Sequence, residues 1–120
     1  MDHYKATGSL VGFNSTIFND VDLLDNKWFT NEAIVNFEGK QMKLGFSYDE
    51  HNYLVVGALI KNKYLANIIC DNKLAGNLNS MVYLNEKGFI LYGCWAEGFM
   101  INEVWGRFDW VDKKEVYVLN

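Results

Sequence analysis

The sequence contains no proline, and only two of its 120 residues are cysteines. Proline cannot donate a backbone hydrogen bond, so its absence suits strands that use every N–H in a ladder, and it excludes proline-rich recognition segments. Cys70 and Cys94 lack the spacing of a zinc site or of a CxxC redox pair. We expect both to be buried free thiols, with a disulfide between neighbouring strands as the alternative.

Long apolar runs are also missing. No hydrophobic stretch approaches the ~18 residues of a membrane-spanning helix, and the start of the chain lacks the basic and apolar parts of a secretion signal. We therefore expect a cytoplasmic protein without a membrane partner, unless a leader was removed before Met1. Because 50% of the residues are hydrophobic and 16% are aromatic, the chain is not disordered, and we expect one domain over residues 1–120.

Basic residues are in the minority, with 11 against 15 acidic residues and a formal charge of −4. The whole excess of acid lies in the first half of the chain. An acidic surface repels phosphate backbones, so we expect no nucleic-acid partner. Such a surface would steer a basic protein by long-range attraction, although a modest negative charge also serves simple solubility.

Short apolar strands, separated by polar turns of a few residues, follow one another through most of the chain, as in consecutive antiparallel hairpins. The predicted strands are His3–Phe13, Ala33–Phe37, Met42–Tyr48, Tyr53–Lys61, Tyr64–Asp71, Gly76–Leu84, Phe89–Glu97, Glu103–Asp112 and Val116–Leu119. A long meander must curl or close to protect its edges. We therefore predict an all-β fold, an antiparallel up-and-down meander of about 8–9 strands that forms a small barrel or a strongly curled sheet.

Two segments depart from the regular alternation. Residues 14–27 break the strand pattern, and we predict a short helix at residues 15–25, with a short strand as the alternative. Tyr53–Ile60 is apolar on both faces. A central strand with two covered faces would give this pattern, and so would a strand whose outer face packs on residues 14–27 or on a second subunit of a homo-oligomer.

Glycine recurs two positions before a large apolar residue, as in Gly8-Ser9-Leu10, Gly57-Ala58-Leu59, Gly76-Asn77-Leu78, Gly93-Cys94-Trp95 and Gly106-Arg107-Phe108. Glycine weakens a strand, so its repeated use indicates bulges, sharp bends or close approaches of another backbone. Bends that recur along a meander are what closure of a small barrel requires.

A short meander with Gly93-Cys94-Trp95 and a late arginine, Arg107, resembles the calycin barrels of the lipocalin and avidin type. Those families carry Gly-x-Trp on the first strand, where this chain has Gly8-Ser9-Leu10. They also place a late arginine against the tryptophan. The resemblance implies a small barrel that binds a small, often apolar ligand in its interior.

No catalytic motif, phosphate-binding loop or metal-ligand spacing is present, so we expect no catalytic residues, no metal and no cofactor. His3 and His51 lack a second ligand at metal spacing, and His51 is expected in a solvated turn. The best polar candidates lie on the last two long strands. They form a candidate cluster of Trp95, Glu97, Glu103, Trp105 and Arg107. This cluster would anchor a ligand if it lined a barrel interior, and it would be a weak ion-pair network on an outer face.

Large apolar residues occupy the predicted turn from Gly98 to Asn102, where they would plug a barrel end or touch a partner. Our first functional hypothesis is a protein-binding module, a small acidic immunity protein that inhibits a basic toxin or nuclease by steric occlusion. Its expected partner-binding residues are Asp20, Asp22, Asp25, Asp49, Glu50, Phe99 and Met100. The alternative is a calycin-like binder of a small apolar ligand, and an enzyme on the same scaffold is a third hypothesis.

Overall fold

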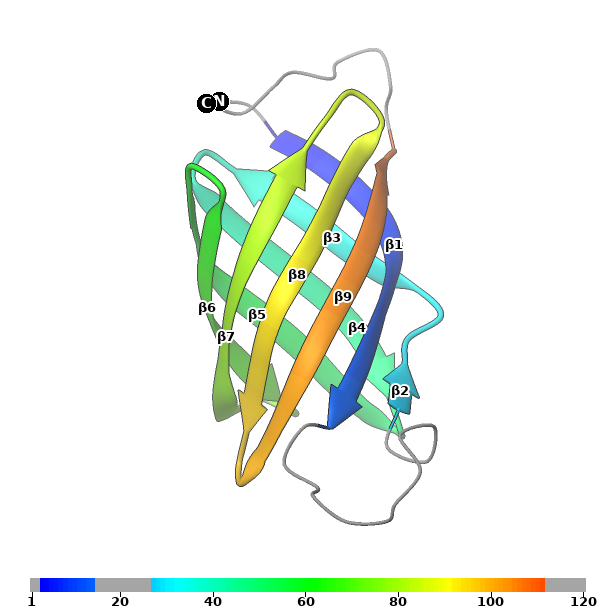
Figure 1. Ribbon diagram of the computed structural model, residues 1–120, viewed down its shortest axis with the longest axis vertical. Coiled ribbons are helices and arrows are strands. Elements are labelled where there is room, and N and C mark those ends of the chain that lie inside the picture. The colour runs from blue at the N-terminus through cyan, green and yellow to red at the C-terminus, as the bar shows by residue number, and fades with distance from the viewer. Residues whose placement is uncertain (1–2, 15–26, 112–120) are drawn as a thin grey trace.

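The computed structural model describes residues 3–14 and 27–111, which fold into a closed antiparallel β-barrel (Figure 1). Its strands are β1 (His3–Asn14), β2 (Lys27–Phe29), β3 (Ala33–Glu38), β4 (Gln41–Tyr48), β5 (His51–Ile60), β6 (Lys63–Cys70), β7 (Lys73–Leu84), β8 (Gly88–Glu97) and β9 (Met100–Trp110). From β3 to β9 each strand pairs with the next, and β1 pairs with β3 and β9. The predicted all-β up-and-down barrel is therefore confirmed.

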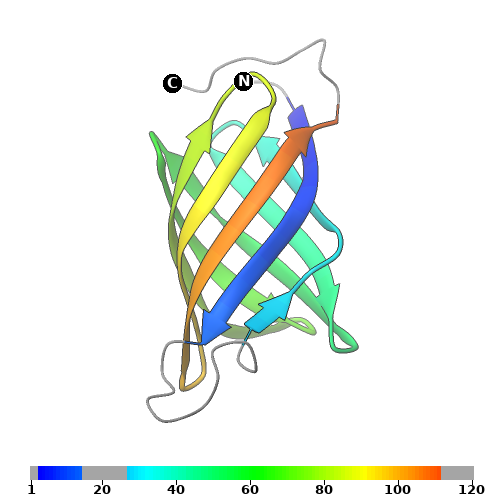
Figure 2. The same ribbon diagram turned by 45° about the vertical axis from the view of Figure 1, so that its right-hand side comes forward.

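The barrel closes along a long seam between its first and last strands. The β1–β9 register runs from Ala6 opposite Trp110 to Asn14 opposite Asn102, and Figure 2 shows these two strands side by side. Eight strands complete the cylinder, and β2 adds a short ninth strand on β1 beyond the end of β3. This architecture is the one that the resemblance to calycin barrels implied.

Strict alternation of side chains separates the inside of the barrel from the outside. In β3 and in β9 from Asn102 onward, buried and exposed residues alternate without a break, which is the pattern of a sheet with one solvated face. The buried residues of all the long strands form a single hydrophobic core. Tyr64 lies fully buried in it and donates its hydroxyl hydrogen to the carbonyl oxygen of Met42 at 2.8 Å.

Several strands extend further into the hairpin turns than the sequence predicted. β5 begins at His51 instead of Tyr53, β7 at Lys73 instead of Gly76, and β9 at Met100 instead of Glu103. The turns are tight because Asp49, Glu50, Asp71 and Asn72 adopt positive φ angles of 49°, 65°, 48° and 68°. The predicted turn over residues 98–102 is therefore wrong, and residues 100–102 belong to β9.

Other predictions have different outcomes. β2 was not predicted as a strand of its own, and the predicted helix at residues 15–25 and strand Val116–Leu119 lie outside the described residues. The outer face of β5 is exposed within this chain, with Ile60 57% accessible. Both cysteines are free, but Cys70 is only partly buried and Cys94 points outward from β8 and is exposed, so their predicted burial is wrong. Within residues 3–14 and 27–111, no helix is long and apolar enough to cross a membrane.

The recurring glycines mark both a bulge and close approaches between strands. The register of β6 and β7 shifts between Ile68 and Ile69, which leaves Ala75 as an extra residue next to Gly76. At Gly57 a Cβ atom would lie 2.0 Å from the carbonyl oxygen of Leu65, so no side chain fits between these strands. Both explanations had been drawn from the sequence.

Candidate functional site

The two ends of the barrel interior differ. At the end that carries the β3–β4, β5–β6 and β7–β8 turns, Phe37, Phe89, Phe108 and Trp110 fill the cylinder and are at most 5% exposed. The Phe89 and Phe108 rings stack with centroids 4.7 Å apart. We call this the packed end, which is uppermost in Figure 1. The opposite end, with the β4–β5, β6–β7 and β8–β9 turns, is hollow, and we call it the pocket end.

The hollow at the pocket end has a volume of about 240 Å³. Its lining residues are Trp28, Phe46, Tyr48, Tyr53, Trp95, Glu97, Met100 and Asn102. All of them lie at or near the ends of strands, and none comes from the middle of the barrel. The site is therefore a cup at one mouth of the barrel, not a chamber that runs along its axis.

The walls of the cup are aromatic rings, of which Phe46 and Tyr53 stack at 11° and the others meet at steeper angles. Trp95, 2% exposed, lies at the centre of the group, with its ring centroid 5.5 Å from Trp28, 5.8 Å from Phe46 and 5.9 Å from Tyr53. Tyr48 packs against the other side of Trp28 at 6.0 Å. These contacts fix the rings in place, so the cup exists before any ligand enters.

Trp28 reaches the cup because a glycine on the neighbouring strand makes room for it. Gly12 of β1 pairs with Trp28 of β2, and a Cβ atom on Gly12 would lie 2.1 Å from the indole ring. The indole Nε1–H donates to Oδ1 of the buried Asn102 at 3.1 Å, and Nδ2 of Asn102 is 3.5 Å from the carbonyl oxygen of Trp95. Asn102 thus ties the two tryptophans to β9.

Among the described residues that line the cup, Glu97 is the only charged one. Its Oε2 accepts a hydrogen bond from the Tyr53 hydroxyl at 2.9 Å, and its Oε1 accepts one from the Trp95 indole N–H at 3.0 Å. Burial, followed by the hydrogen bond to Glu97, holds the pKa of Tyr53 far above its usual value of 10.0. Tyr53 therefore stays protonated, and the Glu97 carboxylate is held in one orientation by two donors.

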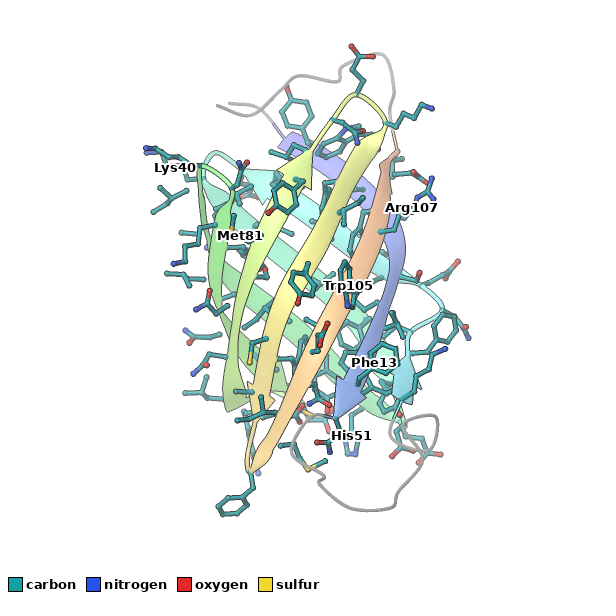
Figure 3. The ribbon with its side chains drawn as sticks, in the orientation of Figure 1. Phe13, Lys40, His51, Met81, Trp105 and Arg107 are labelled. Atoms are coloured by element: carbon teal, nitrogen blue, oxygen red, sulfur yellow. The ribbon has the colours of Figure 1, made fainter. Side chains whose placement is uncertain are left out.

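A second polar group lies on the rim of the cup. His51 lies at this end of the barrel (Figure 3). Its Nδ1 is 2.6 Å from Asp71 Oδ2, while Asp71 Oδ1 accepts the backbone N–H of Asn52 at 2.9 Å. Cys70 Sγ lies close to both residues, so nitrogen, sulfur and oxygen donors that zinc accepts come together here. Two ligand atoms bound to one tetrahedral zinc ion, each at a distance of ~2.0 Å from the metal, lie about 3.3 Å from each other. The 2.6 Å between His51 Nδ1 and Asp71 Oδ2 is shorter than this and is the distance of a direct hydrogen bond. We therefore describe His51 and Asp71 as a hydrogen-bonded pair.

The predicted polar cluster does not form one site. Trp95 and Glu97 face the cup, whereas Glu103, Trp105 and Arg107 are on the exposed face of β9 (Figure 3). The alternation along β9 had placed these last three on one face, and that part of the prediction is confirmed. Because this face is the outer one, Arg107 does not anchor a ligand inside the barrel, and the outer-face alternative holds for Glu103, Trp105 and Arg107.

The predicted partner-binding residues are also divided. Asp49 and Glu50 form the β4–β5 turn at the pocket end, and Phe99 is fully exposed at the tip of the β8–β9 turn. Met100 lines the cup. The remaining members, Asp20, Asp22 and Asp25, lie outside the described residues.

Sequence reasoning missed most of the cup, because Trp28, Phe46, Tyr48, Tyr53 and Asn102 come from four separate strands. It also missed the His51–Asp71 pair, whose members lie 20 residues apart in sequence. A usable signal was the clustering of aromatic residues at inward positions near the same ends of successive strands.

No family model matches the chain, and no curated protein or solved structure matches it.

Proposed function

We propose that this protein binds a small organic molecule in the aromatic cup at the pocket end of the barrel. The observation that carries the proposal is a preformed hollow of about 240 Å³, walled by five aromatic side chains and containing one oriented carboxylate. Binding sites of small molecules are typically concave and mostly apolar, with a few placed polar groups. This proposal takes up the alternative that the sequence left open, a ligand binder of the calycin type.

The size of the cup limits the ligand. Pockets for drug-sized molecules measure about 300–1,000 Å³, so a hollow of about 240 Å³ suits a smaller compound, such as a single ring with a short polar arm. Since the middle of the barrel is filled by core side chains such as Leu44, Val55 and Leu91, a long lipid chain has no room to enter.

Probe titrations followed by NMR test this proposal. We would add phenylethyl alcohol, phenylethylamine and phenylacetate separately to the ¹⁵N-labelled protein and follow the indole N–H resonances of its four tryptophans. At least one probe should shift the resonances of Trp28 and Trp95, which line the cup, and leave those of Trp105 and Trp110 nearly unchanged. Uniform shifts at all four tryptophans, or no shift with any probe at millimolar concentration, would overturn the proposal.

Two matched variants provide the control. Trp95→Leu removes an indole from the cup and should abolish probe binding, whereas Trp105→Leu removes one from the outer face and should leave it intact. Native mass spectrometry of the protein purified from its source would add a direct search for a bound compound.

Inhibition of a basic protein is a second candidate function, and one observation favours it. Phe99 is 101% exposed at the tip of the β8–β9 turn, on the same end of the barrel as the acidic turn residues Asp49, Glu50 and Asp71. An exposed aromatic beside negative charge is a suitable anchor for a basic toxin or nuclease. Phe99→Ser should then abolish a stable complex with such a partner, and a salt-insensitive association rate would argue against this function.

A further inference from the structure

The hydrogen-bonding groups of the cup are unequally available to a ligand, because nearly all donors are already used within the protein. The Trp28 N–H is bonded to Asn102, and the Trp95 N–H and the Tyr53 hydroxyl are bonded to Glu97. One amide hydrogen of Asn102 points to the carbonyl oxygen of Trp95. A ligand carboxylate or phosphate therefore finds few free donors, and it would lie next to the negative charge of Glu97.

Acceptors, in contrast, remain open. A carboxylate offers about four lone-pair sites, and the two hydrogen bonds to Glu97 use one on each oxygen. No lysine or arginine belongs to the described lining of the cup, so Glu97 has no cationic partner there. Trp28, Tyr48 and Trp95 also line the cup, and aromatic rings of this kind attract cations over their faces.

We propose that the cup selects a small amine in its protonated, cationic form, with an apolar or aromatic body that fills the ring-lined space and an ammonium group that donates to Glu97. This inference rests on the proposed ligand-binding function and names its ligand class. The turns at this end, which contain Asp49, Glu50 and Asp71 and no basic residue, would favour the approach of a cation.

The ranking of three nearly isosteric probes tests the inference. Phenylethylamine, phenylethyl alcohol and phenylacetate share a phenyl ring and a short arm, and they differ in the charge at its end. We expect the amine to bind about ten- to hundredfold more tightly than the alcohol, because a charge-assisted hydrogen bond is stronger than a neutral one. Phenylacetate should bind most weakly of the three.

Variants of two glutamates test whether Glu97 is the source of the preference for the amine. Glu97→Gln should reduce the affinity for the amine by about tenfold or more and change that for the alcohol little. Glu103→Gln is a matched control, since Glu103 Oε1 also accepts an indole N–H, from Trp105 at 3.1 Å, but on the outer face. It should leave all three affinities unchanged. An unshifted Trp28 indole resonance in the unliganded Glu97→Gln protein would show that the cup is preserved, because the Trp28 N–H is bonded to Asn102 and not to Glu97.

The outcomes separate this inference from the proposed function. If no probe binds in the cup, the proposed function itself fails. If the alcohol or phenylacetate binds there as tightly as the amine, or if Glu97→Gln leaves the affinity for the amine unchanged, the cup remains a binding site and the inference of a cationic ligand is overturned.

Discussion

The two ends of this barrel use aromatic residues in opposite ways. At the packed end, Phe37, Phe89 and Phe108 fill the interior, with the Phe89 and Phe108 rings nearly parallel at 13°. At the pocket end, Trp28 and Trp95 meet edge to face at 60° and surround a space instead of filling it. Ring angles do not separate the two ends, since Phe37 and Phe89 meet at 85° at the packed end and Phe46 and Tyr53 stack at 11° at the pocket end. Aromatic content alone therefore does not indicate a binding site, because what matters is whether the rings leave space between them.

The turns at the two ends also differ in charge. The turns at the packed end contain Lys40, Lys61 and Lys87 with a single acid, Glu86, whereas those at the pocket end contain three acids and no base. In the sequence, the excess of acidic over basic residues lies in the first half of the chain. In the fold, successive hairpins alternate between the ends, so the turn charges separate by end of the barrel, and the negative end is the hollow one.

Replacing one phenylalanine at each end should give the largest contrast. Phe89→Ala should lower the free energy of unfolding by about 3–5 kcal/mol, because it leaves a cavity among tightly packed rings. Phe46→Ala should cost at least ~1 kcal/mol less, because Phe46 lines the cup and is 8% exposed, so its removal widens an existing hollow instead of opening a new cavity. Urea denaturation followed by circular dichroism measures both. Equal costs would mean that the two ends are equally well packed.

A smaller effect is expected where the cup depends on a glycine. Gly12→Ala places a methyl group where the Trp28 ring lies, so the indole must move, at a cost of about 1–3 kcal/mol of stability. Binding of the phenyl probes should weaken, and the Trp28 N–H resonance should shift as its bond to Asn102 is disturbed. Urea denaturation measures the loss of stability, and the NMR titration measures probe binding and the Trp28 resonance.

Gly45→Ala is the control for this substitution. A Cβ at Gly45 would be 3.8 Å from the nearest atom, an ordinary contact, so we expect no loss of stability or of probe binding. If both alanine variants retain binding equally, Gly12 does not position Trp28.

The sequence was sufficient for the fold because strand alternation and turn residues are local properties. Ala33–Phe37 and Phe89–Glu97 were predicted to within a residue of β3 and β8, since each has an alternating or apolar run and a clear turn on both sides. The strand starts at His51, Lys73 and Met100 were missed, because the strands pair right up to two-residue turns. The sequence predicted longer turns at these places, and residues 100–102 pair in β9 although Gly98 signals a turn.

The site was much harder to predict, because it depends on pairings between distant strands. That Trp95 and Glu97 share a face follows from their spacing, but that this face is inside the barrel does not. Glu103 and Trp105 have the same spacing and form the same indole-to-carboxylate hydrogen bond outside the barrel. Only the register, which places Trp28 beside Gly12 and Trp95 opposite Asn102, distinguishes the two pairs.

The smallest expected effect concerns the acidic rim of the pocket end. The hydrogen bond to Asp71, followed by the charge of Asp71, raises the pKa of His51 above its usual 6.5. The bond from the Asn52 N–H, followed by the bond to His51, lowers the pKa of Asp71 below its usual 3.8. The contribution of His51 to stability is thus fully present below pH 6.5 and is lost as the pH rises through the folded-state pKa of His51. The contribution of Asp71 is present above pH 3.8 and is lost as the pH falls through the folded-state pKa of Asp71.

An NMR titration of the His51 side chain measures this directly. The pKa of His51 should lie above 6.5 in the unmodified protein and return towards 6.5 in Asp71→Asn, because the variant keeps a hydrogen-bonding side chain but loses the charge. If the pKa of His51 does not change, Asp71 does not set it, and the rim acids Asp49 and Glu50 carry the effect instead.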